Sequence, residues 1–314
     1  MKTIELELRG ALRGILSALV LLVIAGLPAN AASKISIVVS TNDLGSIAAG
    51  VGGDQVEIVG ICKAGADPHH VEVLPSYMVR VARAQLYLKV GLGLDQWADQ
   101  IVDGSHSRHL VVVDCSKGVH VLEKPTGKVD ASMGDVHPDG NPHYWLDPAN
   151  GAIVAHTVAE ALGRADPAHA AEFSARADEF DRAAQALAVR GRELTGAMAS
   201  RNIITYHRSW SYLADAFGLT VLSNVEPVPG IPPTGRHLSE LVSIIKGQKA
   251  SVLLQEPYFS ADAGKFLHRE TGIRIVTMAA ACDAPVAGSY FGHLDALLAA
   301  LAGPTAGGSA PAGK

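Results

Sequence analysis

Short runs of β-branched residues alternate with amphipathic segments in two stretches of the chain. In the first stretch, strand patterns occupy residues 34–40, 55–62, 85–90 and 110–116. Helical patterns accompany them at residues 46–52, 77–84, 95–102 and 148–163. The second stretch repeats this order, with strands at 202–206, 219–225, 251–255 and 273–277 and helices at 211–217, 238–246 and 261–271. Strands that alternate with helices form parallel sheets covered by helices, so the pattern predicts an α/β fold of two lobes, each with a mainly parallel sheet.

A third pattern separates the two lobes. Residues 167–199 contain no strand pattern, and large apolar residues recur there every seven positions, at Phe173, Phe180, Leu187 and Leu194. This spacing predicts one long amphipathic linker helix, which at about 30 residues would span roughly 45 Å and join the lobes. The predicted organisation is a signal peptide (1–31), an N-terminal lobe (32–165), a linker helix (166–200), a C-terminal lobe (201–303) and a disordered tail rich in Gly, Ala and Pro (304–314).

The N-terminal segment predicts export from the cytoplasm. Positively charged residues precede a short apolar run at residues 15–27, and the small residues Ala29 and Ala31 follow at the cleavage positions. This run is shorter than the roughly 20 residues that a membrane-spanning helix needs. Since no cysteine lies near the cleavage point, a lipid anchor is not expected either. We therefore expect cleavage before Ala32 and a soluble protein in the periplasm.

Charge and cysteine content narrow the class of protein further. The formal net charge is −5 and the basic residues form no stripe, which argues against nucleic acid as a partner. Beyond the first apolar run the sequence has no second long hydrophobic stretch, so it does not predict a membrane protein. Cys62, Cys115 and Cys282 are odd in number and far apart, so at most one pair could form and a disulfide framework is not expected.

Three histidines stand in tight polar turns far apart in the sequence. His69 follows Asp67-Pro68, His143 follows Pro142, and His207 directly follows a predicted strand. Neutral imidazole is a common zinc ligand, and three of them nearly fill a tetrahedral site. Ligands of open α/β sheets bind beyond the carboxyl ends of the strands, so each lobe could present histidines across one cleft.

These three turns and one further segment resemble the periplasmic metal-binding solute receptors of ABC transporters, the ZnuA/TroA-like cluster A-I family. The matching segments are DPHHVE (67–72), NPHYWLDP (141–148), YHRSWSY (206–212) and EPVPGIPP (226–233). The resemblance covers about residues 34–302. It implies two α/β lobes joined by one long helix, a metal between them bound by His69, His143 and His207, and a cognate ABC permease as partner. We also expect a monomer.

The resemblance leaves the fourth metal ligand open. Family members commonly place an aspartate in the loop after the last strand of the second lobe. Here that loop reads MAAACDAP (278–285), and Asp283, our predicted fourth ligand, stands one position later than expected. Cys282, Glu256 or a water molecule are the alternatives. His70 is a rival to His69, although the family motif places the ligand directly after the proline.

Three other acidic or histidine-containing features have structural as well as functional interpretations. Asp147, before Pro148, is a helix cap that could also orient His143. Glu226, in a proline-rich loop, is expected to brace the cleft or a linker contact and is not assigned to the metal. In the family, a loop at residues 130–143 is often proposed to collect metal; here it is short and could equally be a solvated loop, with its polar side chains being Asp130, Asp135, His137 and Asp139.

The predicted function is capture of zinc and its delivery to an ABC permease. Three imidazoles with a possible carboxylate suit zinc, whereas manganese prefers sites richer in oxygen, so Mn²⁺ is less expected. The alternative is a secreted zinc-dependent hydrolase, because three histidines and a water also form catalytic sites. Against an enzyme, the sequence has no His-Glu-x-x-His helix and no Gly-x-Ser-x-Gly elbow. A surface adhesin on the same fold would need an anchor.

Overall fold

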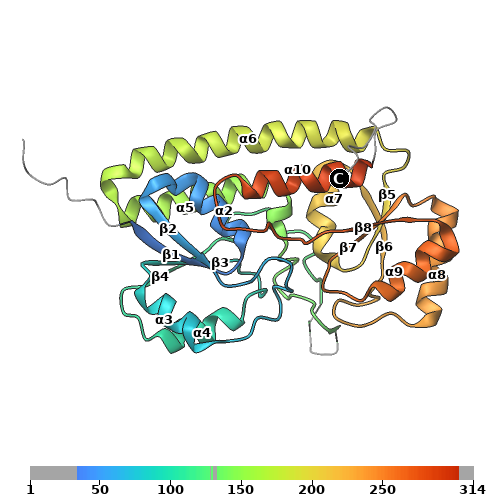
Figure 1. Ribbon diagram of the computed structural model, residues 1–314, viewed down its shortest axis with the longest axis horizontal. Coiled ribbons are helices and arrows are strands. Elements are labelled where there is room, and N and C mark those ends of the chain that lie inside the picture. The colour runs from blue at the N-terminus through green and yellow to red at the C-terminus, as the bar shows by residue number, and fades with distance from the viewer. Residues whose placement is uncertain (1–33, 128, 130–132, 304–314) are drawn as a thin grey trace, which may run out of the picture. The chain divides into compact units, whose positions relative to one another are not determined.

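The computed structural model describes residues 34–303 except 128 and 130–132. Figure 1 shows two sheets with helices around them, joined along one side by the helix α6. The predicted signal peptide, the predicted tail at 304–314 and Asp130 lie outside the described residues. Each sheet has four strands, and all pairs in both sheets are parallel. The predicted α/β fold with two mainly parallel sheets is therefore confirmed.

The first sheet has the order β2-β1-β3-β4. Its strands are β1 (Ile35–Val39), β2 (Val56–Gly60), β3 (Leu86–Lys89) and β4 (Val111–Asp114). They are connected by α2 (Asn42–Gly52), α3 (Pro75–Arg83) and α4 (Trp97–Ser105). The central strand β1 is buried along nearly its whole length because helices cover both faces, as its run of β-branched residues predicts.

The second sheet repeats the same order as β6-β5-β7-β8. Its strands are β5 (Asn202–Thr205), β6 (Thr220–Asn224), β7 (Val252–Gln255) and β8 (Arg274–Thr277). The helices that follow them are α7 (Ser211–Phe217), α8 (Gly235–Gln248), α9 (Ala261–Thr271) and α10 (Ser289–Ala302), of which α10 was not among the predicted elements. In each sheet the next two strands lie on opposite sides of the first one: β2 and β3 flank β1, and β6 and β7 flank β5. This reversal of the strand order places a topological switch point at the carboxyl ends of β1 and β5.

Helix α5 (Pro148–Ala165) completes the first lobe, and helix α6 (Ala170–Gly196) connects it to the second. The 27-residue α6 is about 40 Å long at 1.5 Å per residue. It contacts α2 and α5 in the first lobe and α7 and α10 in the second. Its buried residues keep the predicted seven-residue spacing as far as Gly191, whereas Leu194 is only half-buried; the buried residues are Phe173, Ala177, Phe180, Ala184, Leu187, Gly191 and Thr195. Towards the C-terminal end, Gly191 allows α7 to approach, because a Cβ there would collide with the ring of Phe217.

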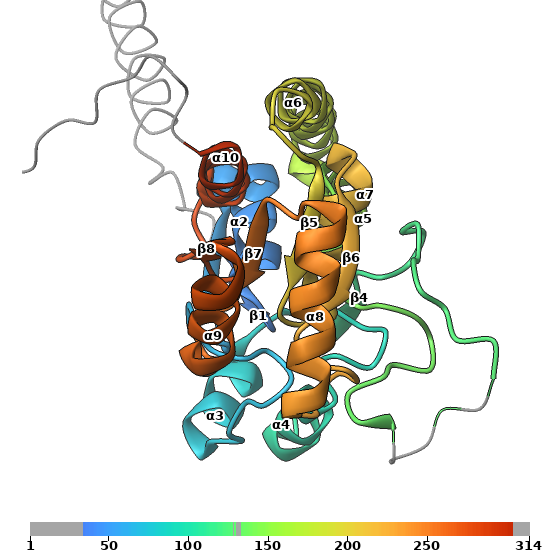
Figure 2. The same cartoon turned by 90° about the vertical axis from the view of Figure 1, so that its right-hand side faces the viewer.

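The chain crosses between the lobes a second time after β8. Asn42 Nδ2 in α2 donates to the backbone oxygen of Cys282 at 3.2 Å, and Ser46 Oγ donates to that of Val286 at 2.7 Å. Helix α10 then packs against both α2 and α6, which Figure 2 shows with α6 seen end-on. The second lobe is thus joined to the first by α6 and, separately, by this return of the chain.

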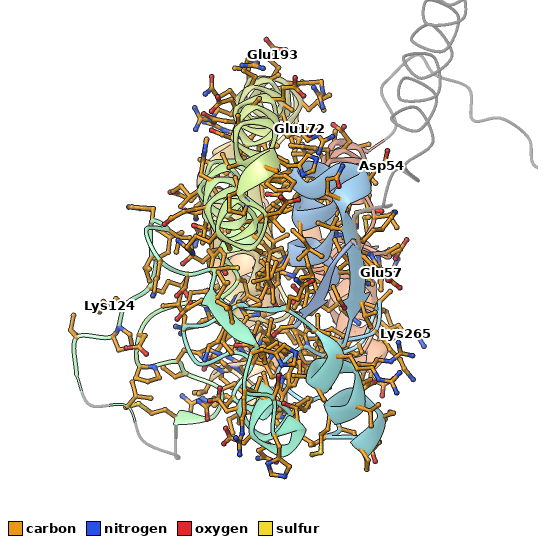
Figure 3. All side chains as sticks on the ribbon, turned by 90° about the vertical axis from the view of Figure 1, so that its left-hand side faces the viewer. Asp54, Glu57, Lys124, Glu172, Glu193 and Lys265 are labelled. Atoms are coloured by element: carbon orange, nitrogen blue, oxygen red, sulfur yellow. The ribbon has the colours of Figure 1, made fainter. Side chains whose placement is uncertain are left out.

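Four acidic side chains illustrate the outer surface of these layers. Glu172 and Glu193 are exposed on α6, Asp54 is exposed just before β2, and Glu57 is exposed within β2 (Figure 3). Cys62, Cys115 and Cys282 are all buried and unpaired with one another. Within the part of the chain that the structure describes, the helices lack the combination of length and apolar character that a membrane crossing requires.

Candidate metal centre

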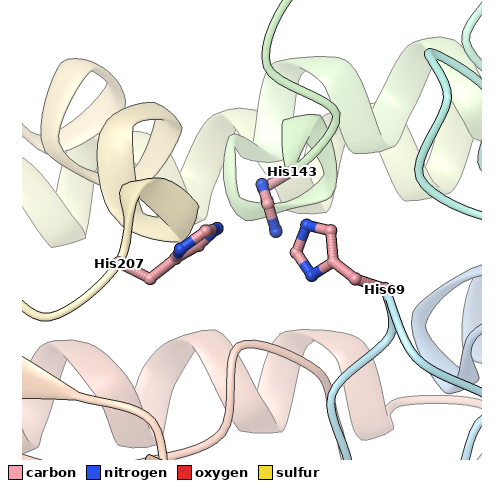
Figure 4. A group of neighbouring side chains, drawn as sticks. All are labelled: His69, His143 and His207. Carbon is pink, nitrogen blue, oxygen red and sulfur yellow. The ribbon is translucent and has the colours of Figure 1, made fainter. Parts of the chain in front are cut away.

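Three histidines from distant parts of the chain converge between the lobes (Figure 4). One ring nitrogen from each of His69, His143 and His207 lies within 4.8 Å of the other two. The ring centroids are 5.1 Å apart for His69 and His143, 5.2 Å for His69 and His207, and 5.6 Å for His143 and His207. His69 belongs to the loop after β2 and His207 directly follows β5, so two strand ends and the loop before α5 build the group.

The first lobe positions its two histidines with the same local motif. Asp67 Oδ1 accepts hydrogen bonds from the backbone nitrogen of His69 at 2.9 Å and from its Nδ1 at 2.8 Å. Asn141 Oδ1 does the same for His143, with both distances 3.0 Å. In each case a proline with a fixed φ separates the acceptor from the histidine. Because Nδ1 holds its proton for this oxygen, Nε2 keeps the lone pair that a metal needs.

His207 is oriented by a residue from another part of its lobe. Glu226 Oε2 accepts from His207 Nδ1 at 2.7 Å and also from the backbone nitrogen of Gly230 at 3.2 Å. Both side chains are buried, with relative exposures of 4% for His207 and 6% for Glu226. Here too, Nδ1 is committed to a carboxylate and Nε2 remains for a ligand.

The electrostatics of the group favour a cation at its centre. Burial and the neighbouring His69 and His207 hold the pKa of His143 well below its usual value, so its ring is neutral. Burial alone would raise the pKa of the Asp67 carboxyl, but hydrogen bonds from His69 outweigh it and the net pKa is lowered. Nε2 of His69 and of His143 are buried with no hydrogen-bond partner among the described residues. Buried polar atoms of this kind normally have a partner, which a metal ion would supply.

A protein-family model matches most of the chain. It describes ZnuA, the periplasmic component A of a zinc-uptake complex, and it covers residues 37–303.
This chain belongs to the ZnuA family.

Relatives of this ZnuA-family chain are named for more than one metal. The high-affinity zinc uptake system protein ZnuA of Haemophilus ducreyi is 23% identical over 273 residues, which cover 81% of this chain and 87% of that protein. The iron-binding protein YfeA of Yersinia pestis is 28% identical over 251 residues, 78% of this chain and 76% of that one. A crystal structure of ZnuA has a TM-score of 0.74 at 23% identity, covers 86% of this chain and 98% of that one, and thereby confirms the predicted ZnuA-like fold.

Asp283, the predicted fourth ligand, is not part of the three-histidine group in this ZnuA-family chain. Its side chain is exposed, and its backbone oxygen accepts from Asn42 Nδ2 at 2.9 Å. The bonds from α2 hold this loop by its backbone, so they fix where the aspartate lies and leave its carboxylate towards solvent. The position of Asp283 therefore gives no support to the predicted ligand.

The alternatives for the fourth position also lie outside the group. Cys282 is buried, its Sγ donates to the backbone oxygen of Ala284 at 3.5 Å, and burial raises the pKa of the thiol, which disfavours the thiolate. Glu256 is fully buried, and burial raises the pKa of its carboxyl to about 7. His70, the rival to His69, has a largely exposed side chain near Asp135.

The residues that orient the histidines differ from those expected. Asp147 caps α5, as predicted, by accepting from the backbone nitrogen of Ala149 at 2.8 Å, whereas Asn141 is the residue that orients His143. The roles of Asp67 and Asn141 were missed, although the sequence repeats the same acceptor-Pro-His spacing at both sites. Glu226 carries no such local signal, because 19 residues separate it from His207.

Two cavities adjoin the histidine group. The smaller has a volume of about 30 Å³, enough to hold a water molecule, and its walls include His137, His143 and His207. The larger, of about 460 Å³, opens beside His69 and His207, and its walls also include Phe259. An ion entering from the larger cavity would therefore meet both lobes at once.

Proposed function

We propose that this protein captures a divalent transition metal, zinc in preference to manganese, with His69, His143 and His207, and delivers it to a cognate ABC permease. The observation that carries the proposal is the convergence of three Nε2 atoms from two lobes, each backed by an oxygen acceptor on Nδ1. Membership in a family described as the periplasmic component of a zinc-uptake complex supports the same function. The permease is the partner that this role requires.

The donor set supports zinc over manganese. All three converging atoms are imidazole nitrogens, which suit zinc, copper, iron and nickel, whereas manganese favours oxygen ligands. The zinc relative of H. ducreyi agrees with this preference, and the iron-binding relative of Y. pestis shows that the family name does not decide the metal. Copper would bind most such sites more tightly than zinc, so metal supply also contributes to selectivity.

Transport fits the chain better than catalysis. A hydrolase would use a zinc-bound water with a general base beside it. Near the three histidines, the carboxylates of Asp67 and Glu226 are both engaged by histidine Nδ1 atoms. The family is described as a component of a zinc-uptake complex. In the proposed role the protein binds and releases the metal without converting a substrate. We propose that it works as a monomer in the periplasm after cleavage before Ala32.

Loading would be signalled by small movements. The lobes are joined by α6 and again by the return of the chain from β8 to α10, so a wide hinge opening would break contacts in both places. Metal binding would instead draw the loops that carry His69 and His143 towards His207 and order them. The permease would recognise the ordered loops at the mouth of the cleft.

A competition titration tests the proposal. The protein purified from the periplasm is stripped of metal and titrated with zinc and with manganese against a chromophoric chelator. We expect one tight zinc site that His207→Ala abolishes, while His156→Ala, at an exposed position on α5, leaves it unchanged. Full-strength zinc binding by His143→Ala or His207→Ala would refute the proposed ligands. Hydrolysis of ester or amide substrates by the zinc-loaded protein would favour the enzyme.

A further inference from the structure

Three imidazoles leave one position of a tetrahedral metal site to be filled. Besides Nε2 of His69 and of His143, one other imidazole nitrogen is buried without a hydrogen-bond partner among the described residues, and it is Nε2 of His137. A buried imidazole with an unused nitrogen is costly unless something binds it. Both carboxylate oxygens of Glu256 are, within the same described residues, buried without a hydrogen-bond partner as well. Of these two residues, only His137 lines a cavity together with His143 and His207, so it is the better candidate for the fourth position.

His137 lies against the histidine group. Its ring stacks on that of His69 with a centroid distance of 5.3 Å and an interplanar angle of 25°. This distance falls inside the range of 5.1 to 5.6 Å that separates the three converging rings from one another. His137 also shares the walls of the small cavity with His143 and His207. Although it lies outside the tight group of three, a modest shift of its loop would bring Nε2 to the same centre.

The loop that carries His137 is fastened to the opposite lobe. The backbone nitrogen of Asp135 donates to the backbone oxygen of Pro229 at 3.0 Å. Gly134, with a φ of 62°, passes so close to that oxygen that a Cβ would collide with it. Pro229 lies between Glu226, which orients His207, and Gly230, whose backbone nitrogen binds the same carboxylate. The position of His137 is thus coupled to that of His207.

We propose that His137 is the fourth protein ligand of the captured metal and completes a site of four imidazoles. The proposal rests on the proposed function and replaces Asp283 in it. Glu256, the remaining buried candidate, lies beside Ser209 and Trp210 and not in the walls of the two cavities described above. A site with four nitrogens and no oxygen disfavours manganese more strongly than one with three nitrogens and an aspartate.

X-ray absorption at the zinc edge tests this ligand directly. It counts the imidazoles bound to zinc through their outer-shell scattering. We expect four in the wild-type protein, three in His137→Ala and His137→Gln, and four in His70→Ala, a histidine from the same cleft with an exposed side chain. Mutation of a residue that only orients a metal ligand typically weakens metal binding about 10- to 100-fold. Removal of a ligand itself should weaken zinc binding by at least as much. The preference for zinc over manganese should fall as well.

Each contrary result points to a different conclusion. Three imidazoles in the wild-type protein, with unchanged zinc affinity in both His137 variants, would overturn the proposal. If Glu256→Gln lost the fourth zinc ligand while both His137 variants kept it, the proposal would be overturned in favour of the Glu256 carboxylate. Thermal unfolding of the metal-free His137 variants and of the wild-type protein shows whether each variant folds normally. If His137→Ala folds poorly, the result for His137→Gln is used to judge the proposal. Zinc binding that depends on His207 but not on His137 would leave the proposed function standing and remove only this ligand.

Discussion

Replacing Glu226 by glutamine tests how strongly the acid behind His207 controls the metal site. Glutamine has nearly the same shape and keeps one oxygen acceptor, but it removes the charge that faces Nδ1 at 2.7 Å. It can also turn its amide nitrogen towards Nδ1, which forces the ring proton onto Nε2 and removes the lone pair for the metal. The change therefore acts on affinity through His207 without removing any proposed ligand.

The magnitude follows from the surroundings of the pair. Mutation of groups that orient metal-bound histidines typically costs about 10- to 100-fold in affinity, or about 1.4 to 2.7 kcal/mol at 1.36 kcal/mol per tenfold. Because His207 and Glu226 are exposed by only 4% and 6%, water cannot replace the lost charge. We expect a loss in the upper half of that range at pH 8.

The pH dependence gives the prediction a second signature. Burial by itself lowers the pKa of His207, but the hydrogen bond to Glu226 and the charges of Glu256 and Glu226 outweigh it, so the pKa lies above 6.5. Zinc affinity of the wild-type protein should therefore begin to fall as the pH drops through this raised value, because the protonated ring cannot bind. In Glu226→Gln the pKa is lower, so the fall starts at more acidic pH and the two affinities approach each other there. In the metal-free protein the pair stabilises the fold fully below the unfolded pKa of about 6.5. That contribution is lost as the pH rises through the folded pKa.

The assay is the chelator competition at pH 6, 7 and 8. Glu240→Gln, on the exposed face of α8 where Glu240 pairs with Arg236, is the control for removing a negative charge. A zinc affinity of Glu226→Gln within twofold of the wild type at pH 8, with the same pH dependence, would refute the reasoning. It would mean that the carboxylate holds the loop in place without tuning the imidazole.

Three further outcomes are expected. Asn141→Asp should lower the Tm and fail to strengthen zinc binding. In the wild-type protein the Asn141 amide nitrogen donates to Glu123 Oε2 at 3.0 Å and to the backbone oxygen of Arg208 at 2.8 Å, and a carboxylate cannot make either bond. Calorimetry measures the Tm, and the chelator titration measures the zinc affinity. Gly191→Ala should destabilise the protein by about 1–3 kcal/mol through overpacking against Phe217, measured by denaturant unfolding, with zinc affinity unchanged. Zinc held free at a hundred times its dissociation constant should stabilise the protein by about 2.7 kcal/mol over the stripped form; an identical Tm with and without zinc would argue against a site in the native state.

Much of the fold is readable from local sequence patterns. The β-branched runs predict both parallel sheets, and the apolar residues spaced seven apart, such as Phe173 and Phe180, predict α6. The return of the chain through α10 was not predicted, because it depends on bonds between residues about 240 apart, such as Asn42 and Cys282. Such contacts leave no periodic signal in the sequence.

The candidate site, too, is only partly predictable from local sequence. His69, His143 and His207 stand in distinctive turns, and Asp67 and Asn141 could have been found from their constant spacing to the histidines. The expectation for Asp283 relied on counting along a loop whose course is set by backbone bonds to another lobe. Side chains brought in by tertiary folding, such as Glu226, require the structure.

The double connection between the lobes also limits how this protein could be turned into a biosensor. Fluorescent proteins fused to the two ends of a hinged receptor report ligand through a change in distance. Here α6 and the return through α10 would keep that distance almost constant, so energy transfer between such fusions should barely change with zinc. An environment-sensitive dye on the loop that carries Gly134 and Asp135 is the better design, because that loop meets the opposite lobe beside the histidines.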